Sequence, residues 1–271
     1  MIGDFPLLFP RLRRCVTQNP SWLGLVVMTL VLTLFIHGTA IAKDNPPPTN
    51  TPRHYTDLQF PPLPEVKLPP YERYELKNGI VVYLMEDHQL PLVKGTALFR
   101  TGSRWEPSNQ VGLADITGTV WRLGGTQAHP AAELNQLLEQ RAAAIETSMG
   151  VSSGSASFDV LGKDVATVFP LFAEVVESPA FAADQVELAK TQARGAIARR
   201  NDDPDDIASR EFGKLIYGAE SPYARIAEYS TLENIRQESI RQFYQTYIRP
   251  QGTILGIVGD FEPQQMKAWI E

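Results

Sequence analysis

The proline content of residues 44–70 is the feature that most limits how this chain can fold. Nine of the 21 prolines lie there, including Pro46-Pro47-Pro48 and Pro69-Pro70. Proline lacks an amide donor and fixes its φ angle, so this stretch is incompatible with a helix interior or a central strand and favours extended, polyproline-like geometry. We therefore predict a proline-rich tether over residues 43–70 and one folded domain over residues 71–271.

Residues 1–42 have the order of an export signal. Three arginines between positions 11 and 14 precede an apolar run at 22–36, and Ala40-Ile41-Ala42 is a small-x-small cleavage pattern. The run is 15 residues long, whereas a membrane-spanning helix needs about 20. A cleaved signal peptide and an uncleaved membrane anchor are the two interpretations. We expect an exported protein, periplasmic or secreted, that contacts a membrane only through an uncleaved leader.

Charge and cysteine content exclude several classes of function. Acidic residues outnumber basic ones by 31 to 25, which gives a net charge of −6. Nucleic-acid binding calls for a clustered basic surface, so no nucleic-acid partner is expected. The single cysteine, Cys15, belongs to the leader. Beyond the leader, the sequence therefore excludes disulfide scaffolds, thiolate zinc sites and cysteine nucleophiles.

Hydrophobic periodicity and turn residues predict a domain that begins with strands and continues with helices. The expected strands are 74–76 and 80–84, joined by an Asn-Gly turn, then 92–100, 144–149, 153–161 and 254–258. The expected helices are 112–122, 133–139, 164–176, 183–200, 206–217, 232–247 and 263–271. This order, with hairpin connections, predicts an α+β fold with a mainly antiparallel sheet packed with helices.

Short phrases occur in a characteristic order along residues 71–271. They are Leu76-Lys77-Asn78-Gly79-Ile80, Thr101-Gly102-Ser103-Arg104-Trp105-Glu106-Pro107, Gly112-Leu113-Ala114, Gly125-Thr126, Glu133-Leu134-Asn135, Asp202-Asp203-Pro204, Ser221-Pro222-Tyr223 and Gly256-Ile257-Val258-Gly259-Asp260-Phe261. Together they resemble the pitrilysin/insulinase family of zinc metallopeptidases. The resemblance implies an insulinase-like metallopeptidase half-domain, the N-terminal peptidase domain. We expect it to be truncated at its C-terminal end and to lack the second, homologous half.

Family members place an inverted zinc motif, H-x-x-E-H, directly after the Gly-x-Ala phrase. Its two histidines share a helix face and bind zinc, the intervening Glu is the general base, and a later Glu is the third protein ligand. Here the motif positions hold Asp115, Gly118 and Thr119, and the later ligand position falls on Gly195 or Ala196. The resemblance therefore implies no catalytic residues and no metal ligands. Zinc is expected as a cofactor only if this inactive interpretation is wrong.

The histidines outside the leader offer no obvious replacement site. His54, His88 and His129 lie in separate segments without metal-ligand spacing. We predict that they are surface residues rather than zinc ligands.

The resemblance also implies partners, because family relatives pair a zinc-bearing subunit with a zinc-less one. We expect a noncatalytic partner of a zinc-bearing insulinase-like subunit, one that binds extended peptide substrate by strand addition at a sheet edge. Two alternatives stay open. One is an active zinc metalloendopeptidase with non-standard ligands, and the other is a nonfunctional truncated fragment.

Overall fold

A computed structural model describes residues 54–58, 60–65, 67 and 69–271. The chain divides into two units, Met1–Val66 and Lys67–Glu271. Within the predicted tether, Tyr55–Asp57 form a short 3-10 helix, η2, where we expected extended chain. The predicted leader, with its apolar run at 22–36, lies outside the described residues. No helix in the described ranges is both long enough and apolar enough to cross a membrane.

The second unit is built on one mixed sheet of six strands in the order β1-β2-β6-β3-β5-β4. The strands are β1 (Glu72–Glu75), β2 (Val81–Glu86), β3 (Leu92–Phe99), β4 (Ala144–Met149), β5 (Gly154–Leu161) and β6 (Ile254–Gly259). Strands β2 and β6 pair in parallel, and the other four neighbouring pairs are antiparallel. The predicted α+β fold with a mainly antiparallel sheet is confirmed.

Eight α-helices accompany this sheet in the described part of the chain. They are α2 (Leu113–Leu123), α3 (Ala131–Glu139), α4 (Val165–Glu177), α5 (Ala183–Arg199), α6 (Pro204–Tyr217), α7 (Tyr229–Glu233), α8 (Gln237–Tyr247) and α9 (Pro263–Ile270). The prediction of one helix over 232–247 is wrong, because α7 and α8 are separate. Between them, Ile235 is fully buried and its carbonyl accepts a hydrogen bond from Lys190 Nζ at 2.8 Å, so this backbone serves a tertiary contact.

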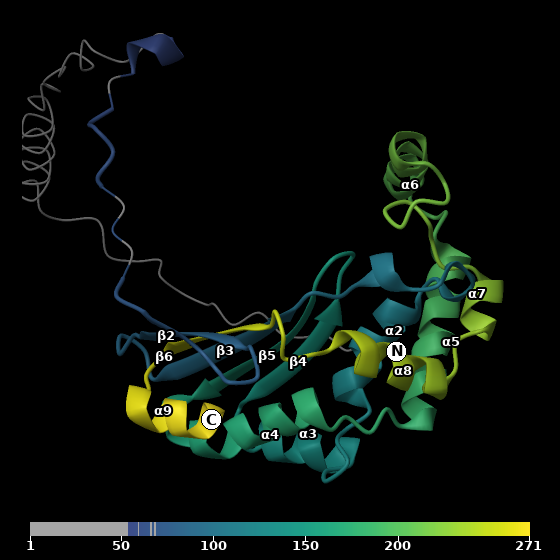
Figure 1. Cartoon of the computed structure of the whole chain (residues 1–271). Coiled ribbons are helices and arrows are strands. Elements are labelled where there is room, and N and C mark those ends of the chain that lie inside the picture. Colours follow the sequence, from purple (N-terminus) through teal and green to yellow (C-terminus); the bar gives the residue numbers. More distant parts are fainter. Residues whose placement is uncertain (1–53, 59, 66, 68) are drawn as a thin grey trace, which may run out of the picture. The chain divides into compact units, whose positions relative to one another are not determined.

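Strand β3 shows how the sheet separates its two faces. Val93, Ala97 and Phe99 are buried, whereas Lys94 and Leu98 between them are exposed. Successive side chains of a strand point to opposite faces, so one face carries the core and the other is open. Helices α3, α4 and α9 lie below the sheet, on the core side (Figure 1).

Aromatic side chains join this helical layer to the sheet. Phe172 of α4 packs on Phe158 of β5 with ring centroids 5.0 Å apart, and Phe169 contacts the same ring edge-on at 5.8 Å. At the other end of the unit, α2, α5, α7 and α8 form a helical group, from which α6 projects (Figure 1). Within this group, the motif-bearing helix α2 contacts strand β4 of the sheet as well as α5 and α8.

Candidate functional site

Helix α2 carries the three positions that match the zinc motif, and Glu106 fixes its start. The buried Glu106 carboxylate accepts the backbone N–H of Ala114 through Oε2 at 2.9 Å. Gly112 precedes the helix with φ of 102°, a conformation that glycine adopts without steric cost. Burial, as the largest cause, raises the pKa of the Glu106 carboxyl, and bonds from backbone N–H groups oppose this effect. The Trp105-Glu106-Pro107 phrase therefore has a structural role at the helix N-terminus.

Asp115 and Thr119 lie one turn apart on α2, where the family motif places histidines. Asp115 is exposed and Thr119 is half-buried. The protein around Asp115 still removes part of its hydration, and this desolvation raises the pKa of its carboxyl. One carboxylate and one hydroxyl thus occupy the helix face that would need two imidazoles to bind zinc firmly.

Gly118 stands at the predicted position of the motif's Glu, and the adjacent strand leaves no room for a side chain there. A Cβ atom at Gly118 would lie 2.7 Å from the backbone nitrogen of Met149 and 3.0 Å from the carbonyl carbon of Ser148. Backbone atoms cannot move aside as the end of a flexible side chain can. The space that a general base would need is therefore filled by strand β4.

Two further contacts hold α2 against the outer side of β4, which is the last strand of the sheet. Arg122 is buried; its Nε donates to the carbonyl oxygen of Ile145 at 3.0 Å, and its Nη1 donates to Asn135 Oδ1 at 2.6 Å. Thr147 Oγ1 donates to the carbonyl oxygen of Gly118 at 2.7 Å. Desolvation lowers the pKa of the Arg122 guanidinium. Helix α2 is thus fixed to the strand at Gly118 and again one turn later, at Arg122.

The position of the later zinc ligand lies on α5, which packs beside α2. Gly195 is half-buried and Ala196 is exposed. A Cβ at Gly195 would meet only Arg199 Nη1, at 3.8 Å. A larger side chain fits here, in contrast to Gly118, so the loss of this ligand is not imposed by packing.

The residues present do not fit a catalytic zinc ion. Of the four motif positions, Asp115 alone carries a group that ligates zinc well, and catalytic zinc takes three protein ligands. Across residues 54–271, apart from the undescribed positions, no group of three or more His, Cys, Asp and Glu residues is arranged to hold a metal ion. No reaction step through zinc follows from this site.

The structure keeps the candidate histidines of the second unit apart. His88 contacts Asp260 through Nδ1 at 2.6 Å, and this hydrogen bond is the largest cause that raises the pKa of the His88 imidazole. His129 Nδ1 lies 2.7 Å from Glu174 Oε2, and its side chain is one quarter exposed. His129 is therefore partly buried and paired with Glu174, whereas His88 is exposed as predicted.

Sequence reasoning assigned no role to Glu106 or Arg122, the two charged side chains that fix α2. Glu106 lies seven residues before the first residue of α2, outside the positions at which helix-capping residues are sought, so no local signal marks it. Arg122 offers no such signal either, because an arginine in the last helical turn is ordinarily read as a favourable exposed charge. Its carbonyl partner lies 23 residues away in sequence.

Comparison with known proteins shows the family. The sequence model of the insulinase family, peptidase family M16, matches residues 81–220. The chain belongs to this family. It is also 24% identical over 188 residues to a protein from Helicobacter pylori named non-peptidase homolog YmxG, a match that covers 69% of this chain and 43% of the relative.

Solved structures show the same fold. The peptidase M16 inactive domain from Pseudomonas fluorescens superposes with a TM-score of 0.68 at 23% identity, covering 74% of this chain and 49% of that structure. A protease from Helicobacter pylori superposes with a TM-score of 0.66 at 21% identity, with the same coverage of both chains. The periplasmic protease PqqL from Escherichia coli gives 0.65 at 18% identity, covering 74% of this chain and 23% of that structure. The chain spans half or less of the length of these relatives.

Proposed function

We propose that this protein is a catalytically inactive insulinase-like domain that acts by binding, as the noncatalytic partner of a zinc-bearing insulinase-like subunit. The observation that supports this proposal most strongly is the packing of Gly118. This residue stands at the predicted position of the general base and packs against the Met149 backbone nitrogen. The names of two similar proteins, a non-peptidase homolog and an inactive M16 domain, support the same proposal. The retained fold with a filled catalytic position favours binding over hydrolysis.

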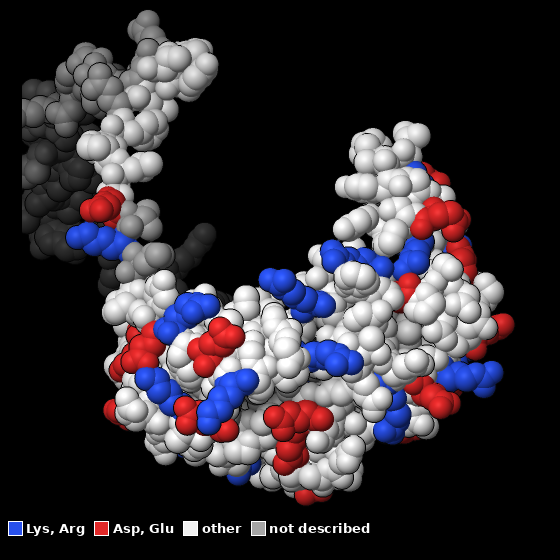
Figure 2. Space-filling view, in the orientation of Figure 1, with Lys and Arg blue, Asp and Glu red and all other residues white. Residues whose placement is uncertain are grey.

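Helix α6 supports a role in association. Its side chains Phe212, Leu215 and Ile216 are 63%, 82% and 56% exposed. They are spaced three and four residues apart, so they share one helix face. Figure 2 shows basic and acidic side chains interspersed over the body of the domain, and much of α6 without charge. Exposed apolar patches of this kind mark interaction sites, and we assign this face to the zinc-bearing subunit.

Peptide binding by strand addition needs a free sheet edge. The outer side of β4 is in contact with α2, through Arg122 and Gly118. Strand β1 is the opposite edge, and most of its residues are exposed. Leu76 donates its backbone N–H to the Ile80 carbonyl, across the pair formed with β2. Because hydrogen-bonded and non-hydrogen-bonded pairs alternate along an antiparallel ladder, the next residue, Glu75, points its N–H away from β2. We propose β1 as the edge that accepts an extended peptide.

We also propose that the protein is exported, with a signal peptide or membrane anchor over 1–42, a tether over 43–70 and the peptidase-like domain over 71–271. The order of the leader supports export, as does the similarity of the fold to a periplasmic protease. Fractionation of the native cells tests this. Recovery of the protein with its leader in the cytosol would contradict it.

Co-purification from the native source tests the partner proposal. We expect the tagged, full-length chain to bring down a zinc-bearing insulinase-like subunit. The double variant Phe212→Ser, Leu215→Ser should lose it, while the conservative Phe212→Leu should retain it. Recovery of the chain alone under mild conditions contradicts an obligate partner.

The peptide-binding proposal has its own test. Fluorescence anisotropy of labelled extended peptides should report binding to the unmodified protein. The Glu75→Pro variant should lose this binding, because proline removes the outward N–H without breaking the bond to β2. Glu75→Ala is the matched control and should bind normally. Equal binding by all three proteins would rule out strand addition at β1.

A further inference from the structure

A basic and aromatic surface lies just beyond the end of β3. The Arg104 guanidinium lies over the Trp105 ring, 4.5 Å from its centroid, and Tyr247 stacks on Trp105 with ring centroids 6.1 Å apart. An arginine held over an aromatic face is attracted to it and loses less conformational freedom when it binds an anion. Arg104 and Trp105 are both exposed, so this guanidinium is accessible to a ligand.

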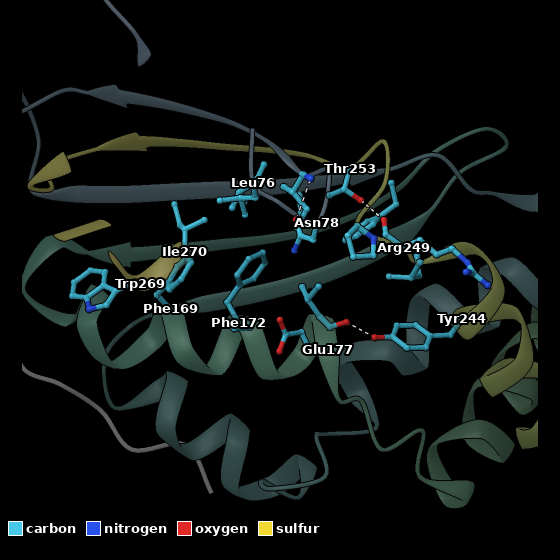
Figure 3. Close-up of a pocket in the computed structure, with 18 of the residues that line it drawn as sticks. Leu76, Asn78, Phe169, Phe172, Glu177, Tyr244, Arg249, Thr253, Trp269 and Ile270 are labelled. Carbon is cyan, nitrogen blue, oxygen red and sulfur yellow. Dashed lines mark hydrogen bonds between the residues drawn. The ribbon is translucent and has the colours of Figure 1, made fainter. Parts of the chain in front are cut away.

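The loop before β6 brings two more arginines to this stack. A Cβ atom at Gly252 would lie 3.5 Å from Arg100 Cδ, so the loop that begins after Tyr247 also contacts the end of β3. Arg249 lies on this loop between the two contacts and is exposed. Figure 3 shows its guanidinium directed away from Glu177, with which it lines a groove between the sheet and α4. We use the term basic patch for Arg100, Arg104, Trp105, Tyr247 and Arg249.

The arginines of the basic patch lack carboxylate partners within the described part of the chain. None of the three takes part in an ion pair there, whereas Lys94, further back on β3, pairs with Asp159 at 2.8 Å. Arg249 donates Nε–H to the Thr246 carbonyl oxygen. The carboxylate of Glu106, beside Trp105, is buried at the start of α2. Exposed arginines without such partners are complementary to a ligand that supplies carboxylates.

The basic patch lies at the end of the sheet toward which a peptide on β1 would extend. Glu75, the last residue of β1, pairs with Val81 of β2. The same row continues through Ile254 of β6 to Leu98 of β3, two residues before Arg100. Neighbouring strands lie about 4.8 Å apart, so β3 is about 14 Å from β1. An extended chain advances about 3.3 Å per residue, so about five residues beyond Glu75 span this distance.

Strand β1 itself disfavours acidic residues in a bound peptide. Glu72 and Glu75 are exposed there, and like charges opposite each other on neighbouring strands are destabilising. Lys267 already pairs with Glu72, and Arg73 Nε donates to the Tyr83 hydroxyl at 3.3 Å. Acidic residues of a peptide are therefore better accommodated past the end of β1 than opposite it.

We propose that the peptide recognised by this protein is acidic at one end. Neutral residues add as a strand to β1, and a stretch of glutamate or aspartate, beginning about five residues past Glu75 in the bound register, binds the basic patch. The inference rests on the proposed peptide binding at β1 and names the charge class of the peptide. Arg100 and Arg104 set the preference.

Three labelled peptides test this with the full-length chain and fluorescence anisotropy. Each has a threonine–valine stretch, a short glycine–serine spacer and an end of glutamate, glutamine or lysine. Both orders of each peptide are made, which covers the two directions of strand addition. The glutamate peptide should bind about tenfold more tightly than the glutamine peptide, and the lysine peptide should bind most weakly. Added salt should reduce the difference, because exposed charges are screened.

Variants locate the preference at the basic patch. The double variant Arg100→Gln, Arg104→Gln should bind the glutamate peptide as weakly as the glutamine peptide, with an unchanged melting temperature because both side chains are exposed. Arg104→Lys keeps the charge but loses the planar guanidinium, and should bind severalfold more weakly. Lys163→Gln is the matched control, because it removes the same charge from an exposed position near Asp260, which follows β6. It should bind normally.

The outcomes separate this inference from the proposed function. Equal binding of the glutamate and glutamine peptides, or unchanged binding in the double arginine variant, would overturn it. Displacement of the glutamate peptide by inorganic phosphate as readily as by the unlabelled peptide would overturn it too. Binding without charge preference that Glu75→Pro abolishes removes this inference alone. A charge preference that survives in Glu75→Pro removes strand addition at β1 and leaves the basic patch as the site of an acidic peptide.

Discussion

Helices α2 and α6 have similar lengths and each contains a glycine in its middle, but they use their apolar faces differently. Eight residues of α2 are buried, including Trp121, whereas α6 has no buried residue. Helix α2 is therefore part of the core of the domain, and the exposed face of α6 contributes little to folding. We therefore interpret α2, which carries the predicted motif positions, as a structural element, and α6 as the proposed association surface.

The largest difference between the two helices in the free energy of unfolding should follow from removing one aromatic ring from each. Trp121 is fully buried, packs on Phe99 and Tyr244 with ring centroids 5.4 and 5.7 Å away, and donates Nε1–H to the Val175 carbonyl. Trp121→Ala should lower the free energy of unfolding by about 3–5 kcal/mol. Phe212→Ala in α6 should change it by less than about 0.5 kcal/mol. Urea denaturation followed by circular dichroism measures both, and comparable losses would show that α6 is packed in solution.

The two glycines give the second comparison. Gly118→Ala should destabilise the domain by about 1–3 kcal/mol, since its Cβ meets the Met149 nitrogen. A Cβ at Gly213 of α6 meets nothing within 4 Å. Gly213→Ala should therefore stabilise the domain by roughly 0.5–1 kcal/mol through helix propensity. Thermal melting of both variants checks the opposite signs, and stabilisation by Gly118→Ala would contradict the filled catalytic position.

Arg122 and Lys214 compare a buried with a partly exposed basic residue. Arg122→Met removes the hydrogen bonds to Ile145 and Asn135 and should cost about 1–2 kcal/mol. Lys214 pairs with the exposed Glu211. Lys214→Met should change the stability by less than about 0.5 kcal/mol. Chemical denaturation at neutral pH measures both, and a negligible loss in Arg122→Met would mean that α2 is not held to β4 by this side chain.

The smallest expected effect concerns the pH dependence at Asp115. Desolvation raises the pKa of its carboxyl in the folded state, so ionisation is less favourable there than in the unfolded chain. Below the ordinary aspartate value of 3.8 both states are protonated, and this contribution is fully present. As the pH rises through the folded-state pKa the contribution is lost. Asp115→Asn should therefore gain stability relative to the unmodified protein as the pH rises from 3 to 7, and a difference independent of pH would contradict the shift.

Much of the fold could be predicted from the sequence because its signals are local. The Asn78-Gly79 turn and the alternation in β3 each depend on neighbouring residues. The prediction of one helix over 232–247 was wrong because the break in this segment involves a contact between residues distant in sequence. Its apolar period continues through Ile235, but this residue lies between α7 and α8, where its carbonyl accepts a hydrogen bond from Lys190, 45 residues away in sequence.

The distinction between local signals and contacts distant in sequence applies to the candidate site as well. The replacement of the motif's His, Glu and His by Asp115, Gly118 and Thr119 could be read directly from the motif spacing. The close approach of Met149 to Gly118 could not, because it joins positions 31 residues apart in sequence through the packing of α2 on β4. The structure thus adds a physical reason for the glycine that the motif spacing does not contain.

Zinc stoichiometry of the purified full-length chain, measured by elemental analysis together with peptide hydrolysis, tests the central claim most directly. We expect no stoichiometric zinc after incubation with the metal, and no hydrolysis that a chelator abolishes. One zinc ion per chain together with chelator-sensitive cleavage would contradict it.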